Sequence, residues 1–103
     1  MKLSKDHLAV LKAIQADAIA NPEAHSGEYP NGIVVTKLAE VTGLSVNQLH
    51  PEPPKGKMPD KPTGILEELM EEGLIGLWAD EVDGEERIGA YLTDEGDRFQ
   101  VSQ

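Results

Sequence analysis

Three lysines in a proline-rich segment are the residues of this chain best suited to hold a negatively charged partner. Lys55, Lys57 and Lys61 lie within residues 51–62, PEPPKGKMPDKP, and they make up one third of the nine basic residues. Lysine side chains contact phosphate oxygens in nucleic-acid complexes and position the protein on the backbone. We expect this segment to be a cationic loop that contacts phosphates, and the alternative interpretation is a solvated proline-rich insertion.

Two amide side chains shortly before this loop could read DNA bases. Asn47 and Gln48 follow Ser45, a residue type that caps the N-termini of helices. Amide side chains pair with adenine edges in the major groove, although amides at helix starts also serve solubility alone. The predicted nucleic-acid-binding residues are Lys37, Ser45, Asn47, Gln48, Lys55, Lys57, Lys61 and Thr63.

The acidic residues suggest a different partner. The net charge is −10, and residues 63–103 carry twelve acids and only two basic residues, whereas residues 1–62 carry seven of each. An acidic surface attracts basic partners and repels phosphates. The alternative function is therefore an interaction module that mimics DNA or otherwise binds a basic protein, through Glu67, Glu71, Asp80, Glu81, Asp83, Glu85 and Glu86. A third interpretation is that the acidity only keeps the chain soluble.

The sequence contains no pattern typical of catalysis or of metal binding. It has no cysteine, no HExxH motif, no glycine-rich phosphate loop and no nucleophile elbow. His25 and Glu28 are three residues apart, but no further ligand follows at a suitable spacing. We expect a protein that is not an enzyme and that needs neither a metal nor a cofactor.

Residues 63–93 predict a helix that runs into a β-hairpin. The helix is indicated by one apolar stripe at 3.6 residues per turn, with Thr63 as its N-cap and Gly73 as its stop. The stripe consists of Ile65, Leu66, Leu69, Met70 and Leu74. Asp83-Gly84 then favours a two-residue hairpin turn.

The turn at Asp83-Gly84 fixes which residues face each other across the hairpin. Pairs whose numbers sum to 167 lie opposite, so that one face is apolar: Ile75, Leu77 and Ala79 against Leu92, Ala90 and Ile88. On the other face the two aromatic residues can cover glycines, and two opposite charges meet. These pairs are Trp78 with Gly89, Tyr91 with Gly76, and Asp80 with Arg87.

Shorter elements are predicted around this unit. Ser4 caps a first helix that Asn21-Pro22 ends, and Leu8, Leu11, Ile14 and Ala18 form its apolar face with Val10 at the margin. Ile33, Val34 and Val35 suit a short third strand. Thr36 is expected to cap a helix with Leu38, Ala39 and Val41 facing inward and Gly43 at its end. Thr93 is expected to cap a short C-terminal helix.

The segment Thr36–Leu49, TKLAEVTGLSVNQL, resembles a helix-turn-helix, with Ala39 as the small contact residue and Gly43 in the turn. With LMEEGLI at residues 69–75 and YLTDEG at residues 91–96, the chain is similar to small winged-helix regulators of the MarR and PadR kind. The resemblance covers nearly the whole chain. It implies an α+β winged helix of three or four helices with a two- or three-stranded antiparallel sheet, and binding to double-stranded DNA.

Two features depart from the family pattern. The recognition helix would run without a break from Ser45 to Gly73, but five prolines within residues 51–62 interrupt it, because proline removes a backbone donor and clashes with the preceding turn. The wing of the family usually offers Arg or Lys to phosphates, whereas this hairpin offers VDGEER. We therefore expect a split recognition helix and a wing that does not insert into DNA.

The remaining expectations concern organisation and location. Residues 1–103 are read as a single domain in which residues 51–62 are an inserted loop. The first ten residues lack an apolar run, and no segment reaches the roughly 18 apolar residues of a membrane span. We expect a cytoplasmic protein without a membrane partner. The short C-terminal helix favours a monomer, or a weak homodimer through the first helix.

Overall fold

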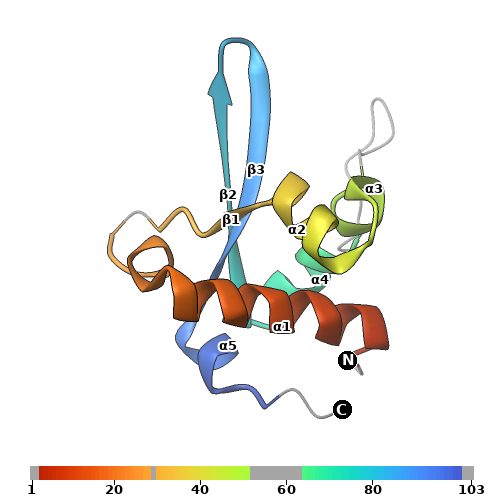
Figure 1. The fold of residues 1–103 in the computed structure, drawn as a ribbon, viewed down its shortest axis with the longest axis vertical. Helices are drawn as coiled ribbons and strands as arrows, with labels where there is room; N and C mark the ends of the chain where they lie inside the picture. The colour runs from red at the N-terminus through yellow and green to blue at the C-terminus, as the bar shows by residue number, and fades with distance from the viewer. Residues whose placement is uncertain (1–2, 29, 52–63, 101–103) are drawn as a thin grey trace.

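The computed structural model describes residues 3–28, 30–51 and 64–100. Within these residues the chain is an α+β arrangement of five α-helices, one 3₁₀ turn and a three-stranded antiparallel sheet (Figure 1). The elements are α1 Lys5–Ala20, η1 Pro22–His25, β1 Ile33–Val34, α2 Val35–Thr42, α3 Val46–Leu49, α4 Ile65–Glu71, β2 Ile75–Val82, β3 Glu85–Leu92 and α5 Asp94–Arg98. The predicted α+β class is confirmed.

The sheet has the strand order β1-β3-β2 and the predicted register. Ile75 lies opposite Leu92, Trp78 opposite Gly89, and Asp80 opposite Arg87. Asp83 and Gly84 both have positive φ angles, 54° and 82°, as a type I′ turn requires. β1 joins as the third strand by pairing with β3, but it consists of Ile33 and Val34 alone.

The helix α1 lies against α2, α4, α5 and β3 and forms one wall of the core. Ser4 caps it as predicted, in a reciprocal capping box with His7. Val10 is completely buried rather than marginal, and Leu8 is only half-buried. The apolar face of α1 is therefore centred one residue away from the predicted one, on Val10, Leu11 and Ile14.

The helix α4 ends as predicted but begins differently. Gly73 has φ 78°, and the amides of Gly73 and Leu74 bond to the carbonyls of Met70 and Leu69, which is a Schellman motif. The prediction of Thr63 as N-cap is wrong, because the cap position is taken by Gly64, which has no side chain to offer. Met70, expected in the apolar stripe, is 44% exposed.

Two predictions for α2 are also wrong. The helix begins at Val35, so Val34 occupies the cap position without a side-chain bond and Thr36 lies inside the first turn. Val41 points to solvent and is 57% exposed, whereas Leu38 is completely buried. Gly43 ends the helix in the left-handed conformation, as expected.

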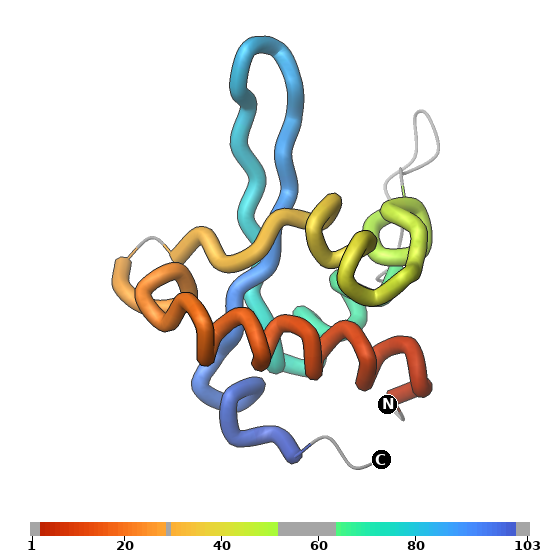
Figure 2. Tube along the Cα trace, in the orientation of Figure 1, coloured from red at the N-terminus to blue at the C-terminus, as the bar shows by residue number. Residues whose placement is uncertain are grey.

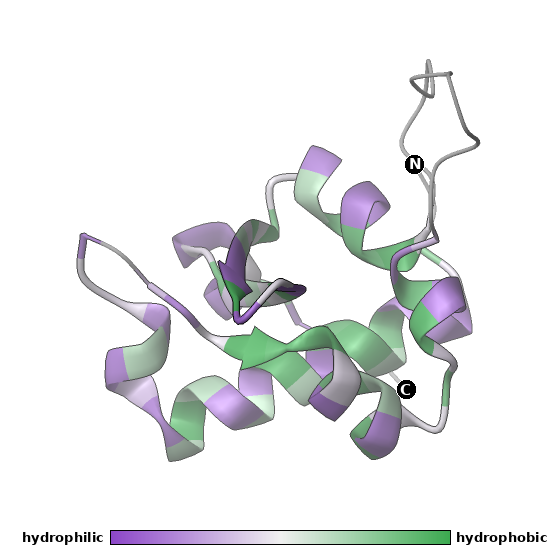
Figure 3. Ribbon diagram, turned by 90° about the horizontal axis from the view of Figure 1, so that it is seen from above, coloured by the Kyte–Doolittle hydropathy of each residue, from purple (hydrophilic) through white to green (hydrophobic). Residues whose placement is uncertain are grey.

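The core lies between the helices and the base of the hairpin. Its completely buried members come from α1, α2, α3, α4 and β3: Val10, Leu11, Ile14, Leu38, Leu49, Leu66, Leu69 and Ala90. Figure 3 shows hydrophobic residues gathered on the strands at the centre and on the helix sides that face them. The tube in Figure 2 shows the rest of the hairpin projecting away from this body as an arm.

The short helix α5 closes the body at the end opposite the arm (Figure 1). Thr93 caps it by accepting the Gly96 N–H at 3.0 Å, as predicted. The Gln15 side chain of α1 donates to the carbonyls of Gly96 and Phe99 at 2.8 and 2.9 Å. Phe99 also packs against the core, so this segment lies on α1 through the described residues up to Gln100.

Candidate nucleic-acid and partner interfaces

The α2–α3 unit carries the predicted base-reading residues. Leu38 and Leu49, both completely buried, anchor its two helices to the core. Ser45 caps α3: its Oγ accepts the Gln48 N–H at 3.1 Å, and the Gln48 Oε1 accepts the Ser45 N–H at 2.8 Å. The two leucines thus fix the unit to the core, and its polar residues lie on the outside.

The four predicted nucleic-acid residues that the structure describes are all exposed. Lys37 lies on α2, and Ser45, Asn47 and Gln48 lie at the start of α3, which packs on α2. Gln48 already uses its amide oxygen in the cap, so it could pair with a base edge only by leaving that bond. Asn47 has no such commitment among the described residues and is the better candidate for base contact.

Residues 52–63 fall outside the described residues, and so do the nucleic-acid-binding predictions for Lys55, Lys57, Lys61 and Thr63. The residues that flank this segment, however, are held together. A Cβ on Gly64 would overlap the ring of Pro51, and the His50 Nδ1 is bonded to the Glu67 Oε1 across the same junction. The two described residues that flank residues 52–63, Pro51 and Gly64, therefore lie side by side next to the C-terminus of α3.

The bond to His50 changes the interpretation of Glu67. Its side chain is only 17% exposed, and its Oε2 is buried without a partner among the described residues. The neighbouring Glu68 is also bound, to His7 Nε2 of α1 at 3.2 Å. Glu67 is therefore not part of an exposed helix face, because this part of α4 is turned toward α3 and α1. Its role in partner binding stays a prediction. Glu71 is exposed, as predicted.

The tip of the hairpin collects the other predicted acidic residues. Every residue from 79 to 87 is exposed, and the group contains Asp80, Glu81, Asp83, Glu85 and Glu86. Glu81 lies directly opposite Glu86, so two like charges face each other across the strands. We call residues 79–87 the acidic arm, and Figure 1 shows that it projects beyond all helices.

Arg87 is the one basic residue of the acidic arm, and Asp80 neutralises it. The guanidinium donates from Nε and an Nη to both carboxylate oxygens at 2.9 and 2.8 Å. The hydrogen bond and the charge of Asp80 raise the pKa of Arg87 above its ordinary value. The pair leaves four carboxylates at the arm without a local counter-charge in the described structure.

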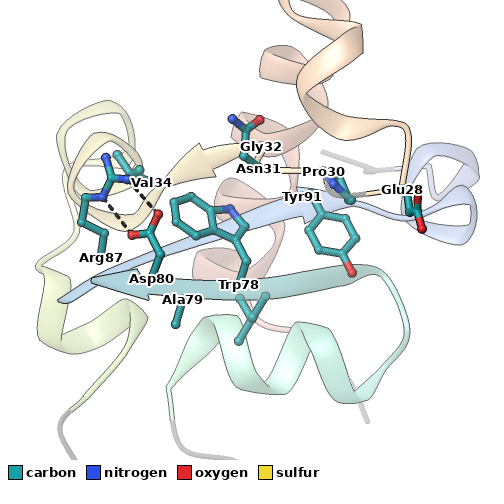
Figure 4. Close-up of a pocket in the computed structure, with 11 residues that line it drawn as sticks. Glu28, Pro30, Asn31, Gly32, Val34, Trp78, Ala79, Asp80, Arg87 and Tyr91 are labelled. Atoms are coloured by element: carbon teal, nitrogen blue, oxygen red, sulfur yellow. Dashed lines mark hydrogen bonds and ion pairs between the residues drawn. The ribbon is translucent and has the colours of Figure 1, made fainter. Parts of the chain in front are cut away.

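A cleft of about 610 Å³ lies on the outer face of the sheet, between the hairpin and the segment that leads into β1 (Figure 4). The rings of Trp78 and Tyr91 form its floor. Each ring lies over a glycine, because a Cβ on Gly89 or Gly76 would overlap it. This confirms the predicted covering of the glycines by aromatic rings, but the pattern of Trp and Tyr alternating with Gly did not by itself reveal the cleft.

Charged groups flank these rings. Figure 4 shows the Asp80–Arg87 pair beside Trp78 and Glu28 on the far side of Tyr91. The indole Nε1 of Trp78 is buried and has no acceptor among the described residues. Such an unmade hydrogen bond costs about 1–3 kcal/mol.

The histidines are structural in the described part of the chain. His25 Nδ1 accepts the Leu92 N–H at 2.9 Å, and Nε2 lies 2.6 Å from Asp17 Oδ2. His25 therefore contacts α1 and β3 rather than pairing with Glu28. Among residues 3–28, 30–51 and 64–100, no three His, Asp or Glu side chains come together in a way that could hold a metal ion.

None of the helices described here combines the length and the apolar character that crossing a membrane demands. The cytoplasmic location and the monomer or weak homodimer stay predictions.

Comparisons with protein-family models, with curated protein sequences and with solved structures find no match to this chain. The resemblance to winged-helix regulators therefore stays a prediction that rests on the sequence motifs.

Proposed function

We propose that this chain is a winged helix-turn-helix domain that binds double-stranded DNA and catalyses no reaction. The order of α1, β1, α2, α3, α4, β2 and β3, with strand order β1-β3-β2, supports this fold. Fold alone does not determine function. The observation that carries the proposal is the α2–α3 unit, which buries Leu38 and Leu49 and leaves Lys37 and Asn47 exposed.

In this proposal the recognition helix is divided between α3 and α4. α3 presents Asn47 to the major groove, and the loop of residues 52–63 starts beside it, so that Lys55, Lys57 and Lys61 contact neighbouring phosphates. α4 supports the junction through the bond between His50 and Glu67. The acidic arm stays away from the backbone, because its carboxylates would repel phosphates at physiological salt.

The test is a titration with a duplex DNA of random sequence, followed by amide NMR at low salt. Amide signals of residues 45–50 and of the non-proline residues of the loop should shift, and the affinity should fall steeply as salt is added. The variant Lys55→Ala/Lys57→Ala should reduce the dependence of log K on log salt by about 2, because each lysine that contacts a phosphate contributes about one unit.

Lys5→Ala/Lys12→Ala is the matched control. It removes the same charge from α1, where both side chains are exposed. If both double variants weaken binding equally, only net charge matters and the interface is not at α3 and the loop. If no signal shifts at low salt, the domain does not bind duplex DNA.

A specific observation favours a second candidate, an interaction module for a basic protein. The acidic arm projects from the body, and its only basic side chain is held by Asp80. Opposite charges at close range steer and orient a partner. The arm would bind a lysine- or arginine-rich surface, including one that otherwise holds DNA.

This candidate is tested with a labelled twelve-residue oligolysine peptide. Glu85→Lys/Glu86→Lys should weaken peptide binding more than Glu23→Lys/Glu40→Lys, which changes the net charge equally at exposed positions outside the arm. Equal losses would mean that the peptide senses only net charge, and this would count against the arm as a site.

A further inference from the structure

We propose that the cleft on the outer face of the sheet binds an organic cation, as a guanidinium or ammonium group that lies against Trp78 and Tyr91. The site is separate from the α2–α3 unit and does not depend on DNA binding. The same chemistry can come from a small free ligand or from an Arg or Lys side chain of a protein partner.

The two rings give the cleft an aromatic floor. Trp78 lies on Gly89 and Tyr91 on Gly76, so each ring rests on backbone where a larger residue would displace it. Figure 4 shows both rings on the same side of the strands, facing the cleft. The electron-rich faces of Trp and Tyr attract cations, and Trp does so most strongly.

The charges that line the cleft also favour a cation. Two carboxylates, Glu28 and Asp80, line it with one guanidinium, Arg87, so one negative charge is in excess. Arg87 and Asp80 satisfy each other through two hydrogen bonds. Glu28 is exposed and has no ion-pair partner among the residues described, so its carboxylate is available to a ligand.

The unmade hydrogen bond of the indole adds a preference for a carbonyl group next to the cation. Trp78 Nε1 is a donor without an acceptor among the described residues. It is shielded from solvent, so a ligand carbonyl reaches it only when the indole ring moves. An acylated amino-acid amide or a peptide carries both a carbonyl and a cationic side chain, and its carbonyl would give this donor an acceptor.

The test uses the fluorescence of Trp78, the single tryptophan of the chain. N-acetyl-arginine amide should change its emission in a saturable manner. N-acetyl-citrulline amide, which has the same shape without the charge, should bind about two- to fivefold more weakly, as loss of a cation–π contact of about 0.5–1 kcal/mol implies. Equal responses to the two compounds, or no saturable response to either, would overturn the proposal.

Two variants locate the site. Glu28→Gln removes the free carboxylate, and Tyr91→Leu removes one ring, and each should weaken arginine-amide binding by about three- to tenfold. Glu23→Gln, an exposed acid outside the cleft, is the matched control and should bind normally. Glu28→Gln changes only an exposed side chain and leaves the fold intact, so unaltered binding in this variant would contradict the site even if Tyr91→Leu unfolds.

The source of the cation is distinguished by a tripeptide, acetyl-Ala-Arg-Ala-amide. Binding at least tenfold tighter than that of N-acetyl-arginine amide supports a protein partner that adds backbone contacts. Equal binding supports a small ligand, and both outcomes retain the cationic site.

Discussion

The two ends of the β2–β3 hairpin share one continuous ladder but differ in what their side chains contact. At the base, Ile75 and Leu92 are buried against the helices, whereas from residue 79 to residue 87 every side chain is exposed. Burial at the base fixes the register, since a slip of one residue would turn the apolar side chains away from the core. The tip continues the same register, but its side chains are exposed, so its charges are not needed to fix the fold.

The largest difference between base and tip should appear when one apolar side chain is shortened at each end. Ile75→Ala removes a side chain that is 2% exposed and should lower the free energy of unfolding by about 3 kcal/mol. Val82→Ala, at a side chain 44% exposed, should change it by less than about 0.5 kcal/mol. Urea denaturation followed by circular dichroism measures both.

Equal losses in these two variants would contradict this difference between the base and the tip. They would mean that the tip packs against something in solution, for instance another copy of the chain. Repeating the denaturation at several protein concentrations would identify that case, because the midpoint of a self-associating chain depends on concentration.

The base, unlike the tip, is also supported by a side chain from another segment, His25. His25→Ala leaves the Leu92 N–H without its acceptor and should cost about 2 kcal/mol. His25→Asn places an oxygen near the position of Nδ1 and should recover more than half of this loss, even though it cannot reach Asp17. Hydrogen exchange of the Leu92 amide reports the bond directly: it should be fast in the alanine variant and slow in the asparagine variant.

The two hydrogen bonds of His25 also determine which ring nitrogen carries the proton. Because Nδ1 accepts the Leu92 N–H, the ring proton of neutral His25 must sit on Nε2, where it is donated to Asp17. Nitrogen NMR of the imidazole should therefore show the Nε2–H tautomer. The opposite tautomer would show that the base of β3 is not held by His25.

The contrast between base and tip also explains which parts of the structure could be predicted from the sequence. The hairpin register follows from local signals, a turn dipeptide and alternating side chains, and these agree with the tertiary packing. The caps at Ser4, Ser45 and Thr93 are local as well.

The wrong predictions share a different origin, because they depend on contacts far along the chain. Thr36 and Thr63 are suitable caps by residue type, but the helices begin at Val35 and at Ile65. Glu67 has the sequence context of a solvated helix face, and only the position of His50, seventeen residues earlier, turns it inward. The outer cleft needs Glu28 and residues 30–34 to lie beside β2 and β3, a placement that no local pattern encodes.

A small change in stability at the tip shows whether its acidic residues serve binding or folding. Glu86→Lys converts the like-charge pair with Glu81 into an attractive one and should raise stability by a few tenths of a kcal/mol. Added salt should shrink this gain, because exposed charges are screened. Glu40→Lys, at an exposed site on α2, changes the net charge equally and is the control. A larger gain for Glu86→Lys than for Glu40→Lys would mean that the acidic arm is maintained at a cost to stability, which is expected when residues are kept for a partner rather than for the fold.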